Sequence, residues 1–180
     1  SGKVTAAGET VRDPGRDFPP ETTLLGVRGE SVDGRLTRHV MLHKPAGLLT
    51  AARDKKQPTV MDIFPACYAA MGCMPVGRLD KDSTGLLLMT NNGDIINKIM
   101  RAGNRHEKEY KVTVDRKITQ EFLDKMAAGV PILDTMTRPC QVFYEGAYTF
   151  RIILTQGLNR QIRRMCEYFG YQVVKLKRIR

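Results

Sequence analysis

Apolar residues change their spacing several times after residue 37, and this change constrains the fold more than any other feature of the sequence. Residues 107–115 alternate between apolar and polar side chains, as a half-buried strand does. A run that begins after Gly157 instead repeats its apolar side chains at helical spacing, at Ile162, Met165, Cys166 and Phe169. This alternation predicts an α+β fold, with a mixed, mostly antiparallel sheet and flanking helices.

Turn residues and short apolar segments define the other expected elements. Thr119 predicts the start of a helix and Gly129 its end, because these residue types favour the N-cap and the position after the last turn. The pattern also predicts short helices at 59–64 and 94–101. Further strands are expected at 39–43, 85–89, 138–145, 149–155 and 171–176, all within one domain that spans 37–180.

The first 36 residues differ from this domain in their pattern of turn residues and apolar side chains. Short strands are expected at 2–9 and 27–32, with turns marked by glycines and by Pro14, Pro19 and Pro20. No amphipathic helix pattern is present between residues 1 and 36. Because the segment has too little apolar surface for a core of its own, we expect an appendage or a fragment of a domain.

Charge points to the class of partner. The chain holds 29 Lys and Arg against 19 Asp and Glu, a formal net charge of +10, which favours a polyanion such as nucleic acid. Its apolar runs are only a few residues long, whereas a spanning helix needs ~20, so we expect a cytoplasmic protein without a membrane partner. The cysteines form no C-x-x-C pair and are expected to be reduced core thiols: Cys67, Cys73, Cys140 and Cys166.

Common cofactor motifs are missing from the sequence. It has neither the phosphate-binding G-x-x-x-x-G-K-[ST] loop nor a strand-linked G-x-G-x-x-G, so no nucleotide cofactor is expected. His39 and His43 lie four residues apart on an expected strand, which places them on one face without a third ligand nearby. No metal site is therefore predicted.

Three segments carry residues suited to chemistry. Residues 75–85 form a polar loop that leads into a buried strand, and its Asp80 is either part of a surface turn or a carboxylate in a controlled environment. Tyr110 is either a core tyrosine or a stacking platform. The arginines after Gly157 either form a solvated face or lie over the carboxylate. Together, a ring, an acid and an arginine are the parts needed to hold a flipped nucleobase.

At these residues the chain resembles the RsuA family of bacterial ribosomal RNA pseudouridine synthases. The resemblance rests on Gly77-Arg78-Leu79-Asp80 with Thr84-Gly85, on Lys108-Glu109-Tyr110 and on residues 157–165. The stretch His43-Lys44-Pro45-Ala46-Gly47 is similar to the Lys-Pro-x-Gly strand end of the family. The motifs occur in family order across about residues 39–178, and together they are highly specific.

The resemblance implies a reaction and assigns roles. Uracil is detached from ribose, rotated and rejoined through carbon, which needs no redox step and no cofactor. By motif match Asp80 is the catalytic carboxylate, acting as a nucleophile or assisting loss of the base, Arg163 orients it, and Tyr110 stacks on the flipped base and helps remove its C5 proton. Residues implied to contact RNA are Arg78, Arg105, Lys108, Arg160 and Arg164.

The resemblance also implies a partner and an organisation. The expected partner is a stem-loop of ribosomal RNA, with 23S favoured over 16S, bound by a monomer. Residues 1–36 are similar to the second half of an S4-type RNA-binding domain, through Gly2-Lys3-Val4 and Val11–Gly15. Relatives continue past Arg180, so we expect the catalytic domain, 37–180, to be truncated at its C-terminus.

Two other functions fit parts of the sequence. A non-catalytic rRNA-binding or ribosome-assembly module is compatible with the charge, but it has no need of an acid pointed at RNA, because a carboxylate repels phosphate. A hydrolase of another glycosidic bond needs a second carboxylate, for which Asp82 is the near candidate.

Overall fold

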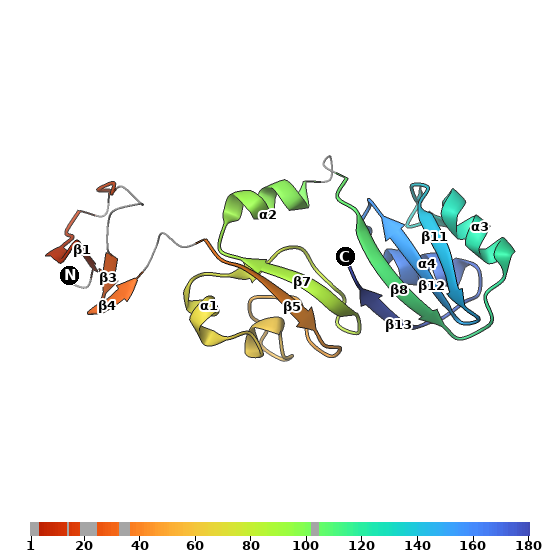
Figure 1. Cartoon of the computed structure of the whole chain (residues 1–180), viewed down its shortest axis with the longest axis horizontal. Coiled ribbons are helices and arrows are strands. Elements are labelled where there is room, and N and C mark those ends of the chain that lie inside the picture. Colours follow the sequence, from red (N-terminus) through yellow and green to blue (C-terminus); the bar gives the residue numbers. More distant parts are fainter. Residues whose placement is uncertain (1–3, 14, 19–24, 33–36, 102–104) are drawn as a thin grey trace.

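A seven-stranded sheet forms the main body of the computed structural model, which describes residues 4–13, 15–18, 25–32, 37–101 and 105–180 (Figure 1). Its strand order is β11-β12-β8-β13-β7-β5, and β6 pairs with β7 off this path. The β13–β7 pair is parallel and the other pairs are antiparallel. The strands are β5 (His39–Lys44), β6 (Met74–Pro75), β7 (Thr84–Thr90), β8 (Lys108–Val114), β11 (Gln141–Gly146), β12 (Thr149–Leu154) and β13 (Val173–Arg178). The predicted fold class is confirmed.

Strand β13 joins the two halves of this sheet. It comes from the end of the chain but lies between β7 and β8, with Arg178 beside Gly85 on one side and beside Tyr110 on the other. Gly85 has a φ of 103°, and a side chain there would collide with the backbone of Arg178. Only glycine allows this close approach, so the Thr84-Gly85 motif is what lets the two halves meet.

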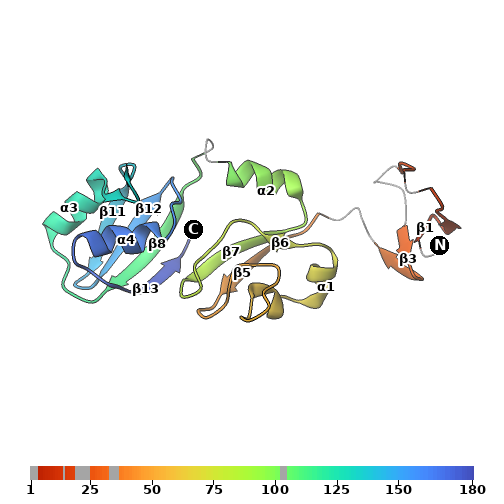
Figure 2. The same ribbon diagram turned by 180° about the vertical axis from the view of Figure 1, so that it is seen from behind.

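Two helices cover one face of the C-terminal half. These are α3 (Gln120–Ala128) and α4 (Gln161–Tyr168), and their apolar sides share one core with β8 and β12. As predicted, the Thr119 side chain caps α3 by accepting from the Phe122 N–H at 3.1 Å. The helix also ends at Gly129, which has a φ of 112°. Figure 2 shows α3 and α4 side by side on this face.

The N-terminal half has a smaller core around Leu87 and Met89. The helix expected at 59–64 is a single 3-10 turn, η1 (Val60–Asp62), which a capping box at Thr59 holds. Helix α1 (Ala66–Ala70) was not predicted, because five residues are too few to show a helical period. It leaves Cys67 exposed, so the expectation of a core thiol is wrong for that residue. Helix α2 (Gly93–Met100) follows β7, close to the predicted range.

Three short hairpins were not predicted, because their turns contain only two residues, and two of them are described first. The strand expected at 2–9 is a hairpin of β1 (Val4–Ala6) and β2 (Glu9–Thr10), and β9 (Pro131–Ile132) pairs with β10 (Thr135–Met136). In each, a two-residue turn has positive φ at both positions, at Ala7-Gly8 and at Leu133-Asp134, as type I′ turns require. The second turn contains no glycine and so gave no sequence signal.

The first hairpin belongs to a separate four-stranded sheet of order β2-β1-β3-β4. Its other strands, β3 (Leu25–Val27) and β4 (Glu30–Val32), form a third hairpin with positive φ at Arg28 and Gly29, so the expectation of one strand at 27–32 is wrong. Gly2, Lys3, Pro14, Pro19 and Pro20 lie outside the described residues. No helix that the described residues form combines the length and apolarity needed to cross a membrane.

Candidate active site

A cleft of about 700 Å³ lies where the two halves of the main sheet meet. The loop before β7 contributes Asp80, β8 contributes Tyr110, and the segment leading into α4 contributes Arg160. Leu86 and Leu88 of β7 and Met100 of α2 supply apolar walls. The cleft thus combines the Asp80 carboxylate, the Tyr110 ring and a partly apolar lining, which suits a flat base attached to a polar backbone.

The rim of the cleft is strongly basic. Of the residues predicted to contact RNA, four line it: Arg78, Arg105, Lys108 and Arg160. Four further cations that the sequence did not single out also line it: Arg101, Arg138, Arg178 and Arg180. Asp80 and Glu107 are the acidic residues in this lining. Such an excess of positive charge attracts phosphates and leaves the Asp80 carboxylate as a local exception.

A buried lysine holds the loop that carries Asp80. Lys44 is fully buried at the end of β5, and its Nζ donates to the carbonyl oxygens of Pro45, Lys81 and Ser83 at 3.0, 3.0 and 2.9 Å. Burial lowers the pKa of Lys44, while the nearby Asp82 and Asp80 raise it. The sequence marked Lys44 as part of a motif, and the structure shows what the ammonium group contacts.

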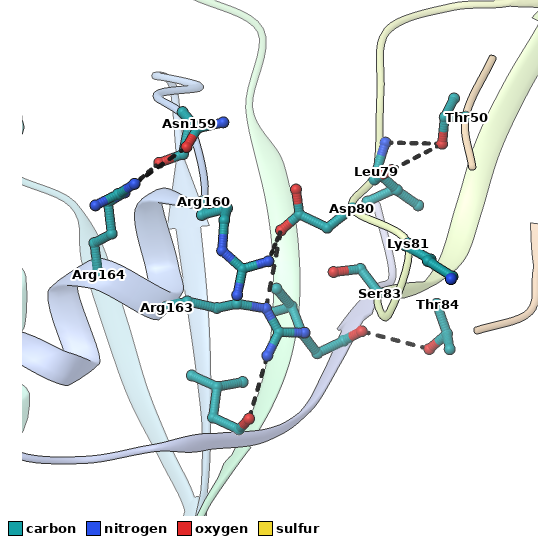
Figure 3. A network of polar contacts seen from close by, with 12 residues as sticks. Thr50, Leu79, Asp80, Lys81, Ser83, Thr84, Asn159, Arg160, Arg163 and Arg164 are labelled. Atoms are coloured by element: carbon teal, nitrogen blue, oxygen red, sulfur yellow. Dashed lines mark hydrogen bonds and ion pairs between the residues drawn. The ribbon is translucent and has the colours of Figure 1, made fainter. Parts of the chain in front are cut away.

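Asp80 faces two arginines from the other half of the sheet (Figure 3). One carboxylate oxygen, Oδ2, lies 3.9 Å from Arg163 Nε and 4.0 Å from Arg160 Nη1. Both distances allow an ion pair but exceed a hydrogen bond. The Asp80 side chain is 33% exposed, so it remains accessible from the cleft.

Arg163 lies on α4, outside the lining of the cleft, and its guanidinium faces the Asp80 carboxylate. Its side chain is 11% exposed, and its Nη1 donates to the Val173 carbonyl oxygen at 3.2 Å. Its Nε is buried and has no hydrogen-bond partner among the described residues, and the hydroxyl of Ser83 is in the same situation. Two buried polar atoms without partners beside a carboxylate are unusual in a folded protein, and active sites are where such groups concentrate.

The segment before α4 aims its arginines in different directions. Arg160, directly before the helix, has a left-handed backbone with a φ of 49°. Gln161 stabilises the turn, because its Oε1 accepts from the Leu158 N–H at 3.0 Å. Arg164 points away and donates to the Asn159 carbonyl oxygen at 3.1 Å. Neither Arg163 nor Arg164 is part of the cleft lining, but Arg163 and Arg160 both lie beside Asp80, whereas Arg164 contacts Asn159 instead.

Tyr110 lines the cleft from β8, beside Arg178 of β13. Burial raises the pKa of Tyr110, and the nearby Arg178 cation opposes that shift. Arg178 is 9% exposed, and its Nε donates to the Leu86 carbonyl oxygen at 2.6 Å. Burial also lowers the pKa of Lys108, in the same direction as the charge of Arg178. Arg178 was missed because the last strand was expected to end at Leu176.

Other candidate groups lie elsewhere. Asp82 is exposed and does not line the cleft, and the second acidic residue of the described lining, Glu107, forms an ion pair with Arg180 at 3.1 Å. His39 Nδ1 lies 2.9 Å from the Thr90 hydroxyl oxygen. Across the described ranges, no group of three or more His, Cys, Asp or Glu side chains is arranged to hold a metal ion.

Comparisons with known proteins point to one family. Residues 38–168 match the RNA pseudouridylate synthase family. The chain is 49% identical to a dual-specificity RNA pseudouridine synthase RluF of Salmonella typhi, over 99% of this chain and 57% of the relative. It is 46% identical to the protein of the same name from Escherichia coli strain K12, over 100% of this chain and 59% of the relative.

A solved structure described as a pseudouridylate synthase superposes with a TM-score of 0.73 at 26% identity. The superposition covers 98% of this chain and 76% of that one. The chain therefore spans less than two thirds of the length of the two sequence relatives above, and most of the length of this structural one.

Proposed function

The chain belongs to the RsuA family of RNA pseudouridine synthases, and we propose that it converts uridine in RNA to pseudouridine with Asp80 as the catalytic carboxylate. The observation that carries the proposal is the placement of Asp80. It is accessible from a basic cleft and lies 3.9 Å from a buried arginine whose Nε has no hydrogen-bond partner in the described structure. A protein that only binds RNA gains nothing from a carboxylate at this position.

The isomerisation exchanges one bond of the base for another. The bond between ribose C1′ and uracil N1 breaks, the base turns, and a bond forms between C1′ and C5. The proton on C5 leaves, and N1 gains a proton. Asp80 assists by stabilising or attacking the electron-poor C1′, while Arg163 and Arg160 keep its charge oriented.

Tyr110 is proposed to stack on the flipped base. Its ring reaches the cleft from a packed strand, so it presents a fixed apolar face beside the carboxylate. Burial raises the pKa of its phenol, which therefore stays protonated at neutral pH. This supports stacking more than it supports removal of the C5 proton by a tyrosine anion.

The proposed substrate is a stem-loop of ribosomal RNA, with 23S RNA favoured. The net charge of +10 and the basic rim of the cleft support a folded RNA. Two relatives carry the words dual-specificity in their names, so we also propose that a second RNA is accepted. Residues 1–36 are proposed to act as part of an S4-type RNA-binding segment, with Arg12 and Arg28 exposed for phosphate contact.

Tritium release tests the proposal. Ribosomal RNA labelled with tritium at uridine C5 should lose label when incubated with the chain, and mass spectrometry of RNA fragments should locate pseudouridine. Asp80→Asn keeps the shape of the side chain but removes its charge, so release should fall below detection while RNA binding survives. A melting temperature measured on the same samples separates lost chemistry from lost folding.

Two outcomes would contradict the proposal. A folded Asp80→Asn variant that still releases tritium would remove Asp80 from the mechanism. A wild-type chain that binds RNA tightly but releases no label would favour the non-catalytic ribosome-assembly module instead.

A further inference from the structure

A single side chain, that of Thr50, contacts both backbone polar groups of Leu79, the residue before Asp80. The Thr50 hydroxyl donates to the Leu79 carbonyl oxygen at 2.9 Å and accepts from the Leu79 N–H at 3.2 Å. Figure 3 shows this contact beside the Asp80 carboxylate. Leu79 is 7% exposed and Thr50 is half-buried, so water competes poorly for these hydrogen bonds.

The loop is also fixed on the other side of Asp80. The Gly47 N–H donates to the Lys81 carbonyl oxygen at 2.8 Å, and Lys44 Nζ donates to the Lys81 and Ser83 carbonyl oxygens. Contacts from residues 44–50 therefore hold the chain on both sides of Asp80: Thr50 holds the residue before it, and Lys44 and Gly47 hold the residues after it.

The geometry of the peptide bond explains why these contacts matter. The Leu79 carbonyl lies in the same rigid plane as the Asp80 nitrogen and Cα, so holding the carbonyl fixes the orientation of that plane. Because the Asp80 side chain leaves the backbone at the edge of this plane, a turn of the plane also turns the carboxylate. A turn of about 20° moves a carboxylate oxygen by roughly 1 Å, and a displacement of that size can cost about 100-fold in rate.

We propose that Thr50 is a positioning residue for the reaction, whose hydroxyl fixes the Leu79 peptide and thereby the Asp80 carboxylate. The inference rests on the proposed function. A hydroxyl suits this task because one oxygen both donates and accepts, and serine shares that property. Valine has nearly the same shape but neither capability, so it leaves both Leu79 groups without this partner.

Steady-state kinetics of tritium release test the inference with three variants. Thr50→Val should lower kcat by about 30- to 100-fold and leave KM nearly unchanged, because RNA contacts stay while the carboxylate shifts. Thr50→Ser should keep kcat within about threefold of wild type, because it retains the hydroxyl. Amide hydrogen exchange should show faster exchange at Leu79 in the valine variant and not in the serine variant.

Gln57→Leu is the matched control. Gln57 Oε1 accepts from Lys81 Nζ at 2.9 Å, so it also bridges toward the Asp80 loop, but through an exposed side chain. Removing this contact leaves the Leu79 peptide untouched, and kcat should equal that of wild type.

Every other result counts against the inference. A Thr50→Val variant with wild-type kcat, one that fails to fold, or one that raises KM alone gives Thr50 no positioning role. An equal loss of kcat in Gln57→Leu would show that any contact with the Asp80 loop has this effect, and not the Thr50 hydroxyl in particular. If the wild-type chain releases no tritium, the proposed function fails first and this inference fails with it, which the wild-type sample shows by itself.

Discussion

The two sides of the cleft are built in opposite ways. On the side of Asp80, Lys44, Gly47 and Thr50 form hydrogen bonds of 2.8–3.2 Å with backbone groups of the loop. On the side of α4, Arg163 and Arg160 approach the carboxylate only to 3.9 and 4.0 Å. Backbone hydrogen bonds thus fix the loop that carries the carboxylate, while the cations meet the carboxylate only at ion-pair distance.

This difference separates positioning from binding. A loop held by shielded hydrogen bonds has its geometry before any ligand arrives, which is the arrangement that catalysis favours. The Nε of Arg163, which lacks a hydrogen-bond partner among the described residues, gains one only when a ligand or a moved carboxylate supplies it. We infer that the Asp80 side is preorganised and that the arginine side tightens around RNA.

The largest effect is expected at Gly85, where β7 and β13 join the two sides of the cleft. Gly85→Ala places a methyl group against the Arg178 backbone at a φ that side chains avoid, so it should cost more than about 4 kcal/mol of unfolding free energy. Urea unfolding followed by circular dichroism measures this. Gly93→Ala is the control, because open space surrounds Gly93 at the start of α2, and its stability should be equal or higher.

A second test removes the buried cation while leaving the loop intact. Arg163→Gln should lower kcat for tritium release by about 100- to 1,000-fold, because the Asp80 carboxylate loses the cation that faces it. Arg164→Gln is the matched variant on the same helix, and it should change kcat little because that side chain points to Asn159. Equal losses in the two variants would show that α4 matters only as a whole.

The salt dependence of RNA binding should distinguish Arg160 from Arg164. Arg160 lines the cleft, so Arg160→Gln should reduce the slope of log Kd against log salt by about 1 for an rRNA stem-loop. Arg164→Gln should reduce it less. Filter binding from low to physiological salt gives both slopes. Identical slopes in the wild type and both variants would place the RNA contact elsewhere.

The smallest expected effect lies on Glu109, away from the Asp80 contacts. Hydrogen bonds from Arg151 and Arg180 lower the pKa of Glu109, with distances of 2.5 and 2.9 Å. A lowered folded pKa stabilises the protein above the unfolded pKa, and that contribution is lost as pH falls through the folded value. Glu109→Gln should therefore lower Tm slightly at pH 7, and the two Tm values should converge in acid. A difference in Tm that stays constant with pH would show that the variant acts through packing and not through the charge of Glu109.

Local sequence patterns determined much of the fold for physical reasons that act over a few residues. Thr119 and Gly129 bound a helix because capping and positive φ are decided by adjacent backbone groups. The alternation in β8 correctly placed Val112, Val114 and the half-buried Tyr110 against the core, but Glu109 on the expected polar face is buried as well, where Arg151 and Arg180 contact it. The short elements escaped prediction, because α1 and β9–β10 are too brief for a period to show.

The site combines both kinds of information. The motif around Asp80, Tyr110 and Arg163 is read from the sequence by family resemblance, and the cleft brings together Asp80, Tyr110 and the arginine segment before α4. Whether these residues act as proposed stays a prediction. Arg178 and Thr50 had no local signal, since each acquires its contact from a residue far away in the chain.

By itself, the sequence determined which residue types were available: an excess of basic residues, two acids in a glycine-bounded loop, and an arginine-rich helix start. Only the tertiary structure decided which of them meet. The insertion of β13 between β7 and β8 brings a loop near residue 80 against a helix near residue 160, and no periodicity encodes strand order across such separations. Long-range pairing depends on the packing of the whole sheet, which a close approach at Gly85 makes possible.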